Sequence, residues 1–383
     1  MPDAFLPAKA VSGRPRHRAK GFIPSFLTIL RKLLLNANLT SMKESYTMLK
    51  SFTQTWKGAV VAALGLTLLG GASAQAQQIT GAGATFPAPL YLKWFQEYKD
   101  ATGAQVNYQA IGSGGGIKNI TAHAVDFGAS DAPMNAAEMA AAPGILHIPT
   151  VAGAVVVAYN IPGIGPGIHL TPTIIADIFL GKITKWNDPQ ITRLSPGTKF
   201  PGTSIFPVHR SDGSGTTNIF TTYLSEVSPE WKDSVGAGKS VHWPNGLGGK
   251  GNAGVAQLIK QNEGGIGYIE LSYAVTYSIS YAGVRNAKGK FVYPSVENTS
   301  AAAEGVTLPA DFRKVITNTS AAGGYPITGF TFLLVYKNGT RPEVKNLLKW
   351  CLTTGQADAA AQQYAPLPPS VKRRALAAVA SMR

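Results

Sequence analysis

The sequence has little cysteine, little charge and no long apolar run after residue 76. Cys351 is the only cysteine among 383 residues, so no disulfide within the chain can stabilise the fold. Charged residues make up 14% and hydrophobic residues 45%, a balance that excludes a disordered chain and favours a compactly folded one. Because no apolar stretch after residue 76 reaches membrane-spanning length, we expect no membrane insertion of that part.

Several motifs of catalysis and nucleotide binding are also missing. The six histidines include no HxH or HExxH pair, so the sequence indicates no metal site. No P-loop motif occurs, and the glycine-rich stretches GAGATF and GSGGGI carry Phe86 and Ile117 where a dinucleotide-binding motif has its third glycine. We therefore expect no cofactor, no metal and no catalytic residue.

The formal net charge of +15 is concentrated at the front of the chain. Residues 1–76 hold 10 Lys and Arg against 2 Asp and Glu, which leaves 25 against 18 for the rest. That remainder is spread along the chain, apart from the run KRR at 372–374, which we interpret as part of a solvated tail. The charge therefore does not predict a nucleic-acid partner.

Residues 48–76 have the pattern of an export signal. Two lysines precede the apolar residues 58–72, a stretch too short to span a bilayer, and the small residues of ASAQA follow. We predict cleavage after Ala74 or Ala76 and a location in the periplasm.

Residues 1–47 precede a complete signal that opens at Met48. We interpret them as an extension from a start site placed too early, because a basic, proline-containing leader has no evident structural role there. The rival interpretation is an additional anchor around FIPSFLTILRKLLL, which Arg31 and Lys32 interrupt.

Three loop-to-helix junctions combine glycine with hydroxyl side chains. In TGAGATFPAP, a turn at Thr85 precedes apolar residues with helical spacing. In AQVNYQAIGSGGG, a strand breaks at Ser113, and helical spacing resumes as far as Val125. In SIFPVHRSDGSGTT, a strand ends near Arg210 and a helix follows the turn. A helix N-terminus has unpaired N–H donors and attracts oxyanions, although a simple N-cap is the alternative at any single junction.

One carboxylate accompanies these donors. Asp131, in VDFGASDAP, follows a short predicted strand, and open α/β sheets bind ligands at that end of their strands. A turn or cap role for Asp131 is the alternative. If its carboxylate faces an anion, it can only accept a hydrogen bond, so the anion must carry a proton. Phosphate carries one near neutral pH, and sulfate does not.

Six stretches together resemble the phosphate-binding proteins of high-affinity phosphate ABC transporters: TGAGATFPAPLYLKWFQEYK, NYQAIGSGGGIK, VDFGASDAPM, FLGKITKWNDPQI, RSDGSGTT and WPNGLGGKGNAGV. The match runs in order from about residue 79 to residue 368. This resemblance implies an α/β fold of the periplasmic binding protein type II class. Each of its two lobes is a mixed sheet flanked by helices, and hinge strands join them. Lobe 1 would comprise residues 77–156 and 329–383, and lobe 2 residues 157–328.

The resemblance also implies a set of phosphate ligands. They would be Thr85, Phe86, Ser113, Asp131, Arg210, Ser214, Gly215 and Thr216, with Phe86 and Gly215 acting through their backbone N–H groups. Asp212 would orient Arg210. The implied partners are protonated inorganic phosphate and the permease and ATPase of an ABC importer, and the implied state is a monomer.

Other functions remain open at this point. A phosphatase could be drawn with Ser214, Asp212 and either His209 or His242 as a triad, but the sequence contains no nucleophile elbow. A binding protein for sulfate or molybdate is opposed by Asp131, whose charge would repel a fully deprotonated dianion. A structural or adhesion role does not account for three donor-rich junctions together with an acceptor.

Overall fold

The computed structural model describes residues 78–383; the extension 1–47 and the predicted signal at 48–76 lie outside them. A large sheet consists of β1 (Ile79–Gly83), β2 (Val106–Ala110), β3 (Phe127–Ser130), β4 (Ile145–Asn160), β6 (Phe206–Arg210), β7 (Leu247–Gly249), β8 (Gly265–Glu270), β9 (Ser280–Tyr281) and β12 (Thr328–Tyr336). Its spatial order is β2-β1-β3-β12-β4-β8-β6-β7, and β9 pairs with β4. A small sheet has the order β11-β10-β5, formed by β5 (His169–Leu170), β10 (Gly283–Arg285) and β11 (Phe291–Val292).

Strand β4 changes its neighbours halfway along its length. Residues 145–154 pair with β12, and residues 155–160 pair with β8, antiparallel in both cases. On the β12 side, β1 is parallel to β2 and β3; on the β8 side, β6 is parallel to β7 and β8. Two parallel groups of strands are therefore joined through the antiparallel strands β4 and β12, and the sheet is mixed.

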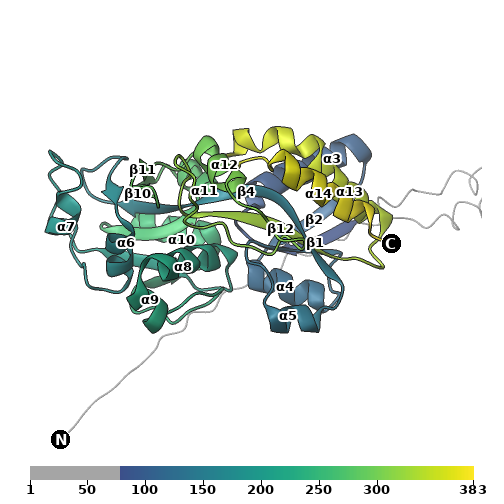
Figure 1. The fold of residues 1–383 in the computed structure, drawn as a ribbon, viewed down its shortest axis with the longest axis horizontal. Helices are drawn as coiled ribbons and strands as arrows, with labels where there is room; N and C mark the ends of the chain where they lie inside the picture. Colours follow the sequence, from purple (N-terminus) through teal and green to yellow (C-terminus); the bar gives the residue numbers. More distant parts are fainter. Residues whose placement is uncertain (1–77) are drawn as a thin grey trace, which may run out of the picture. The chain divides into compact units, whose positions relative to one another are not determined.

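Helices flank these strands. They are α3 (Ala88–Thr102), α4 (Ser113–Thr121), α5 (Ala136–Ala141), α6 (Pro172–Phe179), α7 (Pro189–Thr192), α8 (Gly215–Val227), α9 (Pro229–Ser234), α10 (Gly251–Gln261), α11 (Leu271–Thr276), α12 (Val296–Glu304), α13 (Pro342–Leu352) and α14 (Pro369–Ala380), with 3₁₀ turns η1 (Thr354–Asp358) and η2 (Ala360–Gln362). In Figure 1, α3, α13 and α14 lie on one side of β1, β2 and β12, and α4 and α5 lie on the other. The predicted α/β class, with mixed sheets flanked by helices, is confirmed.

The helical spacing expected after Thr85 is confirmed by α3, which buries Leu90, Tyr91, Trp94, Phe95 and Tyr98. The expectation that helical spacing continues to Val125 is wrong. Helix α4 ends at Thr121, and His123 adopts a left-handed conformation with φ 53° that cannot continue a helix.

The run KRR at 372–374 does not belong to a solvated tail; that interpretation is wrong. It lies in α14, which buries Val371, Ala375 and Val379 at a spacing of four residues. The guanidinium of Arg374 lies 4.7 Å from the centroid of the Phe312 ring. The basic residues thus lie beside and opposite the packed face of a helix. None of the helices within residues 78–383 is long and apolar enough to cross a membrane.

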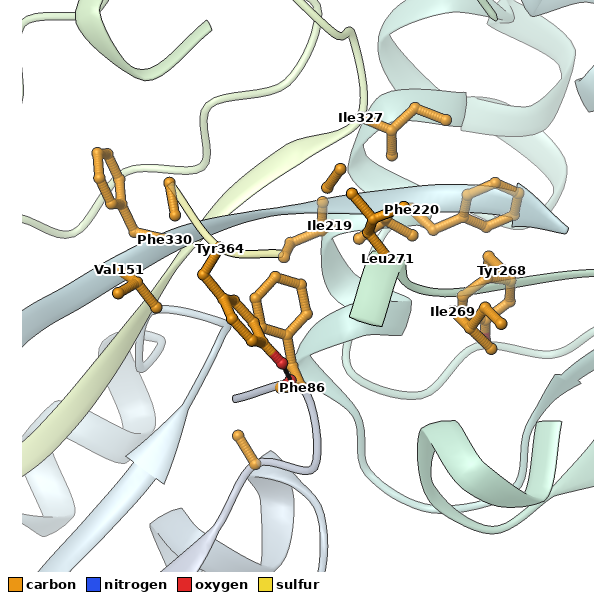
Figure 2. Packing of buried hydrophobic residues seen from close by; sticks show 14 of the residues in the cluster. Phe86, Val151, Ile219, Phe220, Tyr268, Ile269, Leu271, Ile327, Phe330 and Tyr364 are labelled. Carbon is orange, nitrogen blue, oxygen red and sulfur yellow. Dashed lines mark hydrogen bonds between the residues drawn. The ribbon is translucent and has the colours of Figure 1, made fainter. Parts of the chain in front are cut away.

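The buried core runs without a break along β4. Figure 2 shows Phe86 and Tyr364 side by side near Val151, and aromatic residues such as Phe220 and Tyr268 further along. The centroids of the Phe86 and Tyr364 rings are 6.2 Å apart. Phe86 therefore fixes the turn before α3 against the centre of the fold, and Thr85 is held in place by the same turn.

Candidate anion-binding site

The three junctions predicted from the sequence come together in the structure. The N–H of Gly114, in the first turn of α4, donates to the carbonyl of Gly213 at 2.9 Å. The N–H of Gly215, which begins α8, donates to Ser113 Oγ at 3.0 Å. The starts of α4 and α8 are about 100 residues apart in the chain and are thus in direct contact. Thr85 reaches the same place through a partner that the sequence analysis did not single out, Asn252.

Asn252 belongs to a fourth loop-to-helix junction, at the start of α10. The side chain is fully buried, and its Nδ2 donates to Thr85 Oγ1 at 2.9 Å and to Thr216 Oγ1 at 3.2 Å. Its Oδ1 accepts from the N–H of Glu270 at 2.9 Å. The stretch GGKGNAGV has the same glycine-rich character as the other three junctions, and that pattern could have identified this one.

The hydroxyl groups of Thr85 and Thr216 have both lone pairs occupied by protein donors. Thr85 Oγ1 accepts from the side chain and, at 3.2 Å, from the backbone N–H of Asn252. Thr216 Oγ1 accepts from Asn252 and, at 3.3 Å, from Arg210 Nη1. Since a hydroxyl has two acceptor lone pairs and one proton, each of these groups can add only a donated hydrogen bond. The site therefore offers them as donors.

Ser113 and Ser214 are also buried, and their hydroxyl groups already accept hydrogen bonds from the protein. Ser113 Oγ accepts from Gly215 N and, at 3.2 Å, from Asp131 N, so its remaining capacity is also donation. Ser214 Oγ accepts from Thr217 N at 3.0 Å and caps α8. The N–H of Gly215 was expected to face an anion, and in this structure it is directed to Ser113 instead. An added Cβ at Gly215 would lie 2.5 Å from the Asp131 side chain, so only glycine fits there.

Arg210 lies at the end of β6 and is held by a carboxylate. Its Nε donates to Asp212 Oδ1 at 2.8 Å and its Nη2 to Asp212 Oδ2 at 2.5 Å, while the side chain is 1% exposed. Burial by itself raises the pKa of the Asp212 carboxyl, but the hydrogen bonds and charge of Arg210, with the N–H of Gly251, outweigh it and leave that pKa below its ordinary value. Asp212 is thus paired with Arg210 through two hydrogen bonds, and one N–H on each terminal nitrogen of Arg210 remains for a further acceptor.

Asp131 follows β3 and is 3% exposed. Thr331 Oγ1, from β12, donates to its Oδ1 at 2.9 Å, and Ser113 Oγ lies 3.4 Å from its Oδ2. Burial raises the pKa of Asp131 to about 7, and the Thr331 hydrogen bond and the charge of Arg210 oppose that rise only in part. Thr331 is a second partner that the sequence analysis did not single out.

The residues His209, Ser214 and Asp212, from which a catalytic triad could be drawn, are each bonded to other partners. His209 Nδ1 is 3.1 Å from the carbonyl of Arg210, and the His209 ring stacks on Trp243 at 4.9 Å. Ser214 is hydrogen-bonded within its own helix, and Asp212 is paired with Arg210. Within residues 78–383, no three His, Cys, Asp or Glu side chains come together as a metal site would require.

Comparisons with known proteins show which family the chain belongs to. A model described as the PBP superfamily domain matches residues 70–354. The phosphate-binding protein PstS of Xylella fastidiosa is 47% identical over 304 residues, covering 78% of this chain and 83% of that protein. The PstS protein of Haemophilus influenzae is 45% identical over 305 residues, covering 78% and 91%.

A solved structure shares the fold. It is a putative phosphate ABC transporter substrate-binding protein from Clostridium perfringens, with a TM-score of 0.59 and 20% identity, and the match covers 76% of this chain and 100% of that one. The relatives at 45% identity and above, together with the superfamily match, place the chain: it belongs to the PstS family of phosphate-binding proteins, within the PBP superfamily.

Proposed function

We propose that this chain binds inorganic phosphate in the periplasm and delivers it to the permease and ATPase of an ABC importer. The observation that carries the proposal is a buried group of donors around one carboxylate. Thr85, Ser113 and Thr216 have their lone pairs occupied by protein donors, and Arg210 adds two N–H groups and a positive charge. Donors arranged in this way favour an oxyanion, because each of its oxygens can accept several hydrogen bonds.

The ligands of this site are Thr85, Phe86, Ser113, Asp131, Arg210, Ser214, Gly215 and Thr216. A phosphate ion placed among them would compete with Ser113 Oγ for the N–H of Gly215 and with Asp131 for the proton of Ser113. The contact between Ser113 and Asp131 is compatible with such sharing, since its distance of 3.4 Å is long for a hydrogen bond between oxygens.

Asp131 selects the protonation state of the anion. Its carboxylate accepts a hydrogen bond from the protonated oxygen of a phosphate ion, whereas a sulfate dianion has no proton to donate and leaves the buried carboxylate facing a charge of the same sign. A site built to hydrogen-bond one group rejects an analogue that lacks it by roughly four to five orders of magnitude. This argues for phosphate and against sulfate or molybdate as the physiological ligand.

The site lies between two lobes that close on the anion. The change of partner at residues 154 and 155 of β4 supports a boundary there, close to the expected lobe 1 at 77–156 and 329–383 and lobe 2 at 157–328. Thr85, Ser113 and Asp131 then come from lobe 1, and Arg210 and Thr216 from lobe 2. Hinge closure between lobes is a common way to enclose a ligand.

Labelled phosphate tests this proposal. Protein unfolded, freed of anion and refolded should retain one phosphate per chain in equilibrium dialysis, and a hundredfold excess of sulfate should not displace it. Small-angle scattering on the same samples should show a smaller radius of gyration with phosphate than without. Displacement by sulfate would contradict the assignment of the ligand, and an unchanged radius would contradict closure of the lobes.

A further inference from the structure

The peptide group between Thr85 and Phe86 is held from the far side of the site. Its carbonyl, that of Thr85, accepts a hydrogen bond from the hydroxyl of Tyr273 at 2.6 Å, across 188 positions of sequence. Its N–H, that of Phe86, is the donor assigned to phosphate above. The next carbonyl, that of Phe86, accepts from the hydroxyl of Tyr364 at 2.7 Å. Two tyrosine hydroxyls therefore donate hydrogen bonds to two consecutive backbone carbonyls beside the proposed anion site.

The planarity of the peptide links the two ends of this group. Because the C=O of Thr85 and the N–H of Phe86 lie in one rigid plane and point in opposite directions, a donor that fixes the carbonyl also fixes the N–H. A hydrogen bond to the carbonyl also polarises the peptide and strengthens its N–H as a donor. We propose, resting on the function proposed above, that Tyr273 is a positioning residue that aims the Phe86 N–H at bound phosphate.

Tyr273 is suited to this role by its protonation and its location. Burial, with the charge of the neighbouring Glu270, raises the pKa of Tyr273 well above its ordinary value, so the hydroxyl remains a donor throughout the physiological pH range. Tyr273 belongs to α11, in the proposed lobe 2, and Thr85 belongs to the proposed lobe 1. The bond between Tyr273 and Thr85 therefore forms when the lobes come together, and it stabilises the closed state that holds the ligand.

Tyr364 holds the second carbonyl from within the proposed lobe 1. Its hydroxyl is also 3.0 Å from Ser272 Oγ, and Ser272 is bonded through its N–H to Glu270 Oε2 at 2.8 Å. Figure 2 shows the Tyr364 ring packed beside Phe86. Tyr364 thus fixes the backbone on one side of Phe86 in either state of the lobes, and Tyr273 completes the alignment on the other side when the lobes close.

The test is Tyr273→Phe, which removes one oxygen and keeps the ring. We expect phosphate affinity to fall about tenfold, mainly through faster dissociation, since the lost bond belongs to the closed state. The matched control is Tyr293→Phe: the hydroxyl of Tyr293 also donates to a carbonyl, that of Gly167 at 2.7 Å, but outside the site. We expect wild-type affinity for that variant. Calorimetric stoichiometry gives the fraction of folded protein, so affinities are compared on folded molecules alone.

An amide spectrum separates positioning from general stability. Phosphate should shift the Phe86 N–H resonance of the wild-type protein strongly downfield, and this shift should be clearly smaller in Tyr273→Phe. Equal affinity and an equal Phe86 shift in Tyr273→Phe and wild type would overturn the inference while leaving phosphate binding intact. If the wild-type protein itself binds no phosphate, the proposed function fails first.

Discussion

The two aspartates near Arg210 have pKa values shifted in opposite directions. Asp212 accepts two hydrogen bonds from Arg210 and one from the N–H of Gly251, and its pKa lies below the ordinary value. Asp131 is bonded to the hydroxyls of Thr331 and Ser113, and burial raises its pKa to about 7. The residue type is the same, so the difference comes from burial and partners together: the hydrogen bonds and charge of Arg210 outweigh the partial burial of Asp212, whereas the Thr331 hydrogen bond and the charge of Arg210 only partly offset the deeper burial of Asp131.

Because their pKa values differ, the two aspartates are suited to different roles. Asp212 is a fixed negative charge that balances and orients Arg210. Asp131 has a charge that responds to pH and to neighbouring groups, which suits the role proposed for it, the recognition of a proton on phosphate. Changes at Asp131 are therefore expected to alter the selectivity for phosphate over sulfate, whereas changes around Asp212 are expected to leave that selectivity unchanged.

The largest effect is expected for Asp131→Asn. The amide removes the negative charge and adds N–H donors, so sulfate should be admitted and the preference for phosphate over sulfate should fall by about a thousandfold or more. Asp212→Asn is the matched control: it keeps an oxygen for Arg210, and the preference should stay within about threefold. Competition titrations of both variants measure it, and an unaltered preference in Asp131→Asn would refute the role of Asp131.

Arg210→Ala should weaken phosphate binding roughly 100-fold or more, because it removes the cation of the site and leaves Asp212 partly buried without its partner. Arg341→Ala is the control, since Arg341 also pairs with an aspartate, Asp126, with Nε and Oδ1 3.2 Å apart and a side chain that is 45% exposed. Calorimetry should give wild-type affinity for that variant. Wild-type affinity in Arg210→Ala would remove Arg210 from the site.

Stability without anion should depend on pH through Asp131. Its pKa in the folded protein is above its ordinary value, so the folded state binds more protons than the unfolded state between about pH 4 and 7, and its stability falls as the pH rises through that window. The free energy of unfolding of Asp131→Asn minus that of wild type should therefore increase from pH 5 to about pH 7, by at most about 1.4 kcal/mol per pH unit, and then level off.

Urea unfolding in phosphate-free buffers at several pH values measures this difference. Glu270, whose pKa burial raises to about 8, is present in both proteins; the charge of Asp131 is the smallest of the causes of that rise, so most of the Glu270 contribution cancels in the comparison. For Asp212→Asn the sign is reversed. The stability that Asp212 contributes is lost only on acidification through its ordinary pKa and below, so the corresponding difference should be flat above about pH 5. A flat difference for Asp131→Asn would mean that Asp131 titrates normally.

The smallest effect is expected for Thr331→Val. The change removes the hydroxyl that donates to Asp131 Oδ1 while keeping the size of the side chain, so the carboxylate is less stabilised and phosphate affinity should fall about threefold to tenfold. Thr299→Val is the control, because Thr299, in α12, is equally buried and its hydroxyl donates to the carbonyl of Ser295, the N-cap of that helix. A loss of affinity as large in the control would assign the effect to general destabilisation.

The local pattern of the sequence predicted the elements that build this site. The apolar spacing of α3 and the strand before Arg210 are confirmed, since each depends on residues close together in the chain. The glycine-rich stretch before Asn252 marks a junction, but the bonds that Asn252 and Thr331 make to Thr85 and Asp131 span 167 and 200 positions, and no local pattern contains them. The packing of α14 was not predicted, because its buried residues are small and its basic run 372–374 resembles that of a solvated tail.

The most direct test of the account is a calorimetric titration of anion-free protein with phosphate and then with sulfate, at one pH and one ionic strength. A donor-lined site around Asp131 predicts tight binding of one phosphate per chain and no measurable heat from sulfate. Equal binding of the two anions, or binding of neither, would contradict the claim that these junctions converge on a protonated oxyanion.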